Sequence, residues 1–134
     1  MATLIKSIYT GSDVTALGEM TSTDTIDHGV AGKITALTDS ATITLDLSDS
    51  NNFSVSLGGN RTLANPTNIV AGQSGSIFVT QDATGFRTLA YGSYFKFVGG
   101  TAPVLSTAAA SVDRIDYVVA STTQIHAVVS LDVK

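Results

Sequence analysis

The residues of this chain that could perform acid–base or nucleophilic chemistry are few and poorly arranged for it. The run Gly72-Gln73-Ser74-Gly75 resembles a nucleophile elbow, but its second glycine comes one place early. The elbow also needs a helix after it, whereas strand-forming residues follow here, which indicates an ordinary turn. Glu19 is the only glutamate, and Asp113 and Asp116 point to opposite faces of an expected strand. We therefore expect no catalytic residues and no enzymatic activity.

Metal ligation has equally weak support in the sequence. Asp24, Asp27 and His28 lie close together, but one histidine with two carboxylates lacks the spacing that specifies zinc. The turn 46–51 offers carboxylate and amide oxygens to calcium, yet it has no EF-hand pattern of glycine and terminal glutamate. The chain contains no cysteine, which excludes disulfides and thiolate zinc sites. We expect no metal and no cofactor.

The aromatic residues between positions 91 and 97 are the strongest binding candidates. Tyrosines beside serine and asparagine can stack on sugar rings, and the loops 58–61 and 90–94 would then face the ligand. The alternative, which we favour, is that Phe95 and Phe97 belong to the core and the tyrosines cover its rim. The candidate glycan contacts are Tyr91, Tyr94, Asn60 and Arg61.

Composition and charge exclude several classes of partner. Only 13% of the 134 residues are charged, against about 25% in ordinary domains. The net charge is -4 and the seven Lys and Arg residues are scattered, so the phosphates of a nucleic acid would meet no basic stripe. No run of apolar residues is long enough for a transmembrane helix, and the N-terminus does not read as a secretory signal. We expect neither a nucleic-acid nor a membrane partner.

The elements that would position these residues are predicted to be short strands. Apolar and polar residues alternate repeatedly, and Gly, Asn, Asp and Ser interrupt the alternation at short intervals. This pattern predicts an all-β fold, an antiparallel β-sandwich or a jelly-roll-like barrel. Gly58-Gly59-Asn60 is a hairpin-type signal, the last two strands should form a central antiparallel hairpin, and the one candidate helix, 106–110, is too short to be stable. The expected strands are 33–37, 42–47, 53–57, 61–64, 76–81, 86–90, 94–98, 113–120 and 124–133.

The N-terminal arm, residues 1–32, differs from the rest of the chain. It is polar and broken by glycine, with one short expected strand at 3–9 and a second apolar knot at 14–17. Such a segment has too little apolar surface to fold by itself, so it must lie on another surface. We expect an extended docking arm at 1–32 and a β-sandwich domain at 33–134. The apolar residues expected to make this docking contact are Leu4, Ile5, Ile8, Tyr9, Val14 and Leu17.

Several stretches resemble a small β-domain of tailed-bacteriophage virion proteins, which occurs in capsid decoration proteins, head or tail fibres and tail-associated proteins. They are 75–81 (GSIFVTQ), Gly85 before an aromatic strand, 99–105 (GGTAPVL), and Asp113 before a hairpin. The opening segments 4–13 (LIKSIYTGSD), 16–19 (ALGE) and 24–26 (DTI) are similar to the first residues of small phage fibre-type proteins. The resemblance implies a structural role and carries no catalytic residues.

The resemblance leaves the position in the virion open between two alternatives. Because the chain stops after one domain, we expect a capsid decoration (cement) protein on the capsid exterior, made in the host bacterial cytoplasm. Its partners would be the major capsid protein or another virion protein, and closed symmetry favours a homotrimer. The alternative is a short, knob-like head or tail fibre protein that binds host surface glycans.

Overall fold

The structure is a computed structural model that describes residues 5–10, 13–19 and 31–134. The chain divides into two compact units, Met1–Ala31 and Gly32–Lys134, and each is described here by itself.

The first unit contains an antiparallel hairpin. Its strands are β1 (Ile5–Thr10) and β2 (Asp13–Glu19), and the register shifts between Ile8 and Tyr9. The sequence analysis expected one short strand here, and the second strand was missed. Gly11 and Ser12 lie between the two strands, which is the composition of a turn.

The second unit is built on a six-stranded sheet in the order β3-β5-β7-β10-β11-β9. β5 runs parallel to both β3 and β7, β10 runs antiparallel to β7 and β11, and β9 runs parallel to β11. The sheet is therefore mixed. Its strands are β3 (Ile34–Ala36), β5 (Asn52–Leu57), β7 (Ser74–Gln81), β9 (Phe95–Phe97), β10 (Val112–Ser121) and β11 (Gln124–Ser130).

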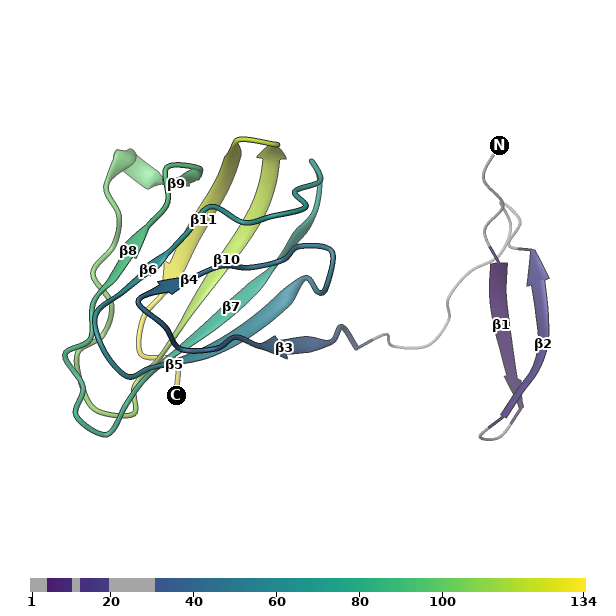
Figure 1. Ribbon diagram of the computed structural model, residues 1–134, viewed down its shortest axis with the longest axis horizontal. Helices are drawn as coiled ribbons and strands as arrows, with labels where there is room; N and C mark the ends of the chain where they lie inside the picture. Colours follow the sequence, from purple (N-terminus) through teal and green to yellow (C-terminus); the bar gives the residue numbers. More distant parts are fainter. Residues whose placement is uncertain (1–4, 11–12, 20–30) are drawn as a thin grey trace. The chain divides into compact units, whose positions relative to one another are not determined.

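A second layer covers one face of this sheet. It contains three parallel strands, β4 (Thr42–Ile43), β6 (Arg61–Leu63) and β8 (Leu89–Tyr91). Figure 1 shows this smaller sheet lying across the larger one. A short 3-10 turn, η1 (Val98–Gly100), follows β9. The second unit is thus a two-layer β-sandwich.

Alternation along the strands defines the core between the layers. On β5, Phe53, Val55 and Leu57 are buried while the residues between them are not. Successive side chains of a strand point to opposite faces, so each strand contributes every second residue. The other large buried apolar residues are Ile43, Leu45, Leu47, Leu63, Ile77, Val79, Leu89, Phe95, Leu105, Ile115, Tyr117, Val119 and Ile125.

The all-β prediction is confirmed, and the closing β10–β11 hairpin pairs as expected. The strands are not all antiparallel, because the chain crosses to the smaller sheet between β5 and β7. Because no other strand of the larger sheet lies between β5 and β7 in the chain, their parallel pairing needs a crossover, and β6 lies in it. The Gly58-Gly59-Asn60 signal is therefore a connection between layers and not a hairpin. Segment 106–110 forms turns, and the strand expected at 42–47 is regular only at 42–43.

Gly75 allows a close approach at the edge of the core. A side chain at this position would overlap the carbonyl oxygen of Asn51. The same carbonyl accepts a hydrogen bond of 2.7 Å from the hydroxyl of Tyr117, which burial holds in its neutral form by raising its pKa to about 12. The start of β7, the loop before β5 and the middle of β10 are thereby held together.

We predict that Gly75→Ala destabilises the domain. The added methyl group must push the Asn51 carbonyl aside, and overpacking of this kind costs about 1–3 kcal/mol. The free energy of unfolding, measured by urea denaturation, should fall by at least this amount. Ser74→Ala, at the exposed neighbouring position, is the control and should change it little. Equal stability of the two variants would contradict the close approach.

Candidate functional site

Three loops gather at the end of the sandwich where β5 and β7 finish and β10 begins. We call residues 58–61, 82–88 and 106–111 the loop end. The backbone N–H of Arg61 donates to the Thr88 carbonyl over 2.9 Å, and that of Phe86 donates to the Thr107 carbonyl over 2.8 Å. These bonds tie the three loops to one another, so the loop end is a single surface.

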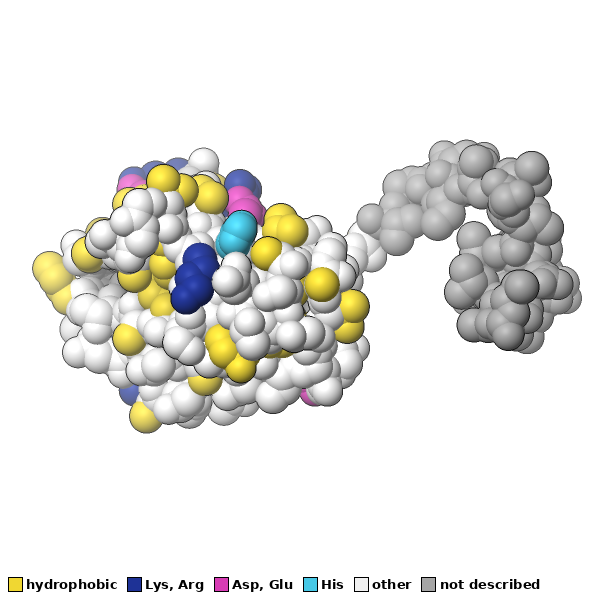
Figure 2. Space-filling view, turned by 90° about the horizontal axis from the view of Figure 1, so that it is seen from above, with side chains coloured by type: hydrophobic (Ala, Val, Ile, Leu, Met, Phe, Trp, Pro, Cys, Tyr) yellow, Lys and Arg dark blue, Asp and Glu magenta, His cyan; other side chains and the backbone are white. Residues whose placement is uncertain are grey.

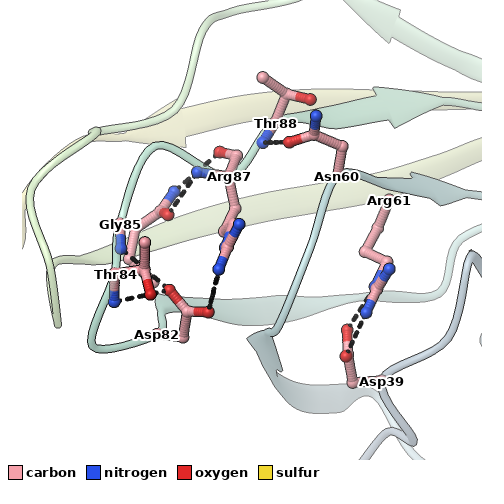
Figure 3. Close-up of polar contacts among 9 residues, drawn as sticks. Asp39, Asn60, Arg61, Asp82, Thr84, Gly85, Arg87 and Thr88 are labelled. Carbon is pink, nitrogen blue, oxygen red and sulfur yellow. Dashed lines mark hydrogen bonds and ion pairs between the residues drawn. The ribbon is translucent and has the colours of Figure 1, made fainter.

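Asp82 organises the loop 82–88. One carboxylate oxygen, Oδ1, accepts from the backbone N–H of Thr84 at 3.0 Å and of Gly85 at 2.9 Å. The other, Oδ2, accepts from Nε and Nη2 of Arg87 at 3.0 and 2.7 Å (Figure 3). The Arg87 guanidinium lowers the pKa of Asp82, and the backbone hydrogen bonds add to this effect. One ionised carboxylate therefore fixes both the turn and the orientation of an arginine.

Gln81, at the start of this loop, is hydrogen-bonded to the backbone of Arg87 near its end. Its side chain is 3% exposed, and its amide donates to the Arg87 carbonyl at 2.9 Å while accepting from the Arg87 backbone N–H at 2.8 Å. Both polar groups of the buried amide are thus satisfied by one residue. The separation between the end of β7 in the larger sheet and the segment that leads into β8 in the smaller sheet is thereby fixed.

A second ion pair lies beside the first at the loop end. Arg61 donates from Nε and Nη2 to the two carboxylate oxygens of Asp39, at 2.7 and 2.6 Å (Figure 3). The hydrogen bond from Arg61 lowers the pKa of Asp39 below its usual value. A Cβ at Gly59 would lie 2.6 Å from Nη1 of Arg61, so the glycine leaves room for the guanidinium. Asn60 then joins the pair to loop 82–88, because its Oδ1 accepts from the Thr88 N–H at 3.1 Å.

The loop end offers hydrogen-bond donors without net charge. Each arginine contacts its aspartate through Nε and Nη2, which leaves the Nη1 amino group available for another acceptor. Two arginines and two aspartates cancel in charge. Within the described residues, no group of three or more His, Cys, Asp or Glu side chains could hold a metal ion. The arrangement suits a ligand rich in hydroxyl groups.

The four candidate glycan contacts do not come together. Asn60 and Arg61 lie at the loop end, whereas the Tyr94 carbonyl accepts from the Ile125 N–H near the turn of the β10–β11 hairpin, at the opposite end. Tyr91 packs edge-on against Phe97, with ring centroids 4.7 Å apart, and both tyrosines pack on the core. Burial of the Tyr91 hydroxyl raises its pKa. The two tyrosines lie at the rim of the core, which is the arrangement favoured from the sequence over a glycan contact.

The aromatic side chain that does lie at the loop end is Phe86, which is 74% exposed. The sequence analysis assigned it to a strand at 86–90, but β8 begins only at Leu89. The sequence feature that indicates a loop at Phe86 is the run Asp82-Ala83-Thr84-Gly85. Its aspartate caps the turn that precedes Phe86.

The other candidate residues have local roles or lie outside the description. Oδ1 of Asp46 accepts from the N–H and hydroxyl of Ser48 and from the Asn68 amide, so it stabilises its own turn. Leu4, Asp24, Asp27 and His28 lie outside the described residues. Ile5, Ile8, Tyr9, Val14 and Leu17 are on the β1–β2 hairpin, where the structure describes only the backbone.

A second surface feature is a hollow of about 450 Å³ on the outer face of the larger sheet, across β9, β10 and β11. Figure 2 shows histidine and basic side chains next to one another on one side of the molecule, with apolar patches around them. Three exposed valines contribute to the hollow, together with charged and titratable side chains. The lining includes Lys96, Val98, Asp116, Val118, His126 and Val128.

Comparison with known proteins gives one match. The model of a family described as "Putative phage tail fibre C-terminal domain" matches residues 37–124, which is more than half of the chain. This range contains β4 to β10 and the whole loop end. No curated protein and no solved structure matches the chain. In the part of the chain that the structure describes, no helix is long and apolar enough to span a membrane.

We predict that the domain loses stability in acid. Asp39 and Asp82 have folded pKa values below the usual 3.8, because each accepts hydrogen bonds from an arginine. The unfolded chain therefore takes up protons first, so the free energy of unfolding is level near neutral pH and falls as the pH drops from about 5 towards 3. Asp82→Asn should be less stable at pH 7 and should show a shallower decline. Chemical denaturation at each pH measures both, and constant stability of the parent down to pH 3 would contradict the ion pairs.

Proposed function

Because the chain belongs to the phage tail fibre C-terminal domain family, we propose that this tailed-phage virion protein recognises saccharides of the host surface through its loop end. The family is a structural one. The fibre alternative of the sequence analysis is thereby preferred to capsid decoration.

The observation that carries the proposal is the geometry of the two arginines. Arg61 and Arg87 each donate two hydrogen bonds to an aspartate, at the same end of the sandwich. Side chains fixed before the ligand arrives lose little conformational entropy on binding. Planar donors and acceptors of this kind match the paired hydroxyl groups of a sugar. The loop end therefore has both the rigidity and the chemistry for saccharide recognition.

The N-terminal arm is the proposed attachment segment. Residues 1–32 would connect the domain to another virion protein, with apolar contacts from Leu4, Ile5, Ile8, Tyr9, Val14 and Leu17. The supporting observation is the β1–β2 hairpin, whose outer edges are able to pair with a strand of a partner. Attachment and recognition would then be performed by separate units of the chain.

We further propose that the chain forms a homotrimer through the outer face of the larger sheet. The hollow there has exposed valines, and both signs of charge lie within it. In a three-fold assembly each copy contacts its neighbour through a different part of this surface, and a surface that carries both signs of charge can make those contacts complementary. Val118 is 53% exposed in this hollow. Val118→Lys should convert the trimer into a monomer, as measured by light scattering after size exclusion, whereas Val70→Lys should not. A monomeric parent would contradict this interface.

Saccharide recognition predicts a specific effect at Arg61. Arg61→Ala should weaken binding of the purified chain to host cells about tenfold, because a charged hydrogen bond is lost. Lys33→Ala is the control, since Lys33 also pairs with an aspartate, Asp49, but lies near the start of β5, away from the loop end. Binding isotherms on fluorescent chain measure both variants, after melting curves confirm folding. An equal loss in the two variants would contradict a role for the loop end.

Copy number separates the fibre proposal from decoration. We expect a few copies per virion, in a multiple of three, when the chain is quantified by mass spectrometry against the major capsid protein. A number approaching that of the shell protein would instead support a decoration protein that docks on the capsid through residues 1–32.

A further inference from the structure

We infer that Phe86 is the stacking surface for a neutral pyranose ring at the loop end. This inference rests on the proposed function and names its contact residue and ligand class. Phe86 is the sole large apolar side chain of the loop end that is exposed, and it lies next to Arg87 in the chain.

The backbone at Phe86 is in an unfavourable conformation. Its φ is 60°, in the left-handed region that glycine and asparagine tolerate and that bulky residues rarely adopt. A domain that needed only a turn at this position would be better served by glycine. Strain of this kind persists where the surrounding structure enforces it, and it is concentrated at functional sites. The large exposed ring at a strained position therefore points to a contact with a ligand.

The surrounding loops hold Phe86 in place. Its backbone N–H donates to the Thr107 carbonyl at 2.8 Å, and the residue before it, Gly85, has a φ of 73°. A Cβ on Gly85 would lie 2.5 Å from the Thr107 oxygen, so the two loops are in direct contact there. Asp82 and Gln81 fix the loop on both sides of Phe86. The backbone that carries the ring is thus positioned before any ligand binds.

The chemistry around the ring selects the class of ligand. One face of a pyranose carries C–H groups that pack on an aromatic ring, while its hydroxyls accept from donors such as Nη1 of Arg87 and of Arg61. The charges of Arg61, Arg87, Asp39 and Asp82 cancel, so an acidic sugar would gain no net attraction. A single exposed ring among small polar residues offers too little apolar area for a stable protein interface. A neutral hexose or N-acetylhexosamine fits these properties.

Phe86→Gly tests the inference without unfolding the protein. Glycine removes the ring and tolerates a φ of 60°, so the melting temperature should equal or exceed that of the parent. The melting temperature of Phe86→Asn should likewise equal or exceed that of the parent, because asparagine tolerates a positive φ. The matched control is Val70→Ala, which also shortens an exposed apolar side chain but lies near the opposite end of β10, away from the loop end.

The full chain would be applied to an array of neutral and acidic bacterial surface polysaccharides, and the affinity for the best neutral one measured by titration. We expect Phe86→Gly to bind about tenfold or more weakly and Val70→Ala to bind as the parent does. Unchanged affinity of Phe86→Gly, or binding of acidic polysaccharides alone, would overturn the inference and leave saccharide recognition in place. Absence of any binding by the parent would overturn saccharide recognition itself, and the inference with it.

Discussion

The parallel pairing of β5 and β7 determines where the loops of this domain lie. Parallel neighbours finish at the same edge of a sheet, so the segments that follow them, 58–60 and 82–88, must begin side by side. The crossover through β6 then brings Arg61 back against Thr88, and the antiparallel β10 starts at the same edge. The gathering of Arg61, Arg87 and Phe86 at one end is thus a consequence of strand order. The core supports it, because a shift of β5 by one residue would expose Phe53, Val55 and Leu57.

The sequence was sufficient to predict the buried face of most strands, but not which strands are neighbours. Alternation on β5 and β10 identified the core face, because a half-buried strand alternates whatever its partner is. The same alternation carries no information on strand direction, so Gly58-Gly59-Asn60 was interpreted as a hairpin although its strands lie in different layers. Likewise, Asn60 and Arg61 could be chosen as polar loop residues, whereas their aromatic neighbour could not. Only the three-dimensional arrangement of the loops shows that Phe86 lies beside them.

Strain and rigidity at the loop end have a common physical origin. The ionised carboxylate of Asp82 accepts hydrogen bonds from two backbone N–H groups and from an arginine, and these bonds fix the loop. They hold Phe86 in a backbone conformation that is unfavourable for a bulky residue. The conformation of Phe86 lowers the stability of the domain, and the hydrogen bonds of its neighbours raise it, as expected where a surface is shaped for binding. A decoration protein would need its main contact surface towards the capsid, whereas a fibre domain needs its rigid surface outward. The position of the loop end in the virion therefore distinguishes the two roles.

The most direct test of this account is a cryo-electron microscopy map of the intact virion into which the domain can be placed. The account predicts density for the domain at the distal end of a tail fibre, with residues 58–61 and 82–88 facing away from the particle. Density on the capsid shell, or a domain whose loop end is covered by another virion protein, would contradict it.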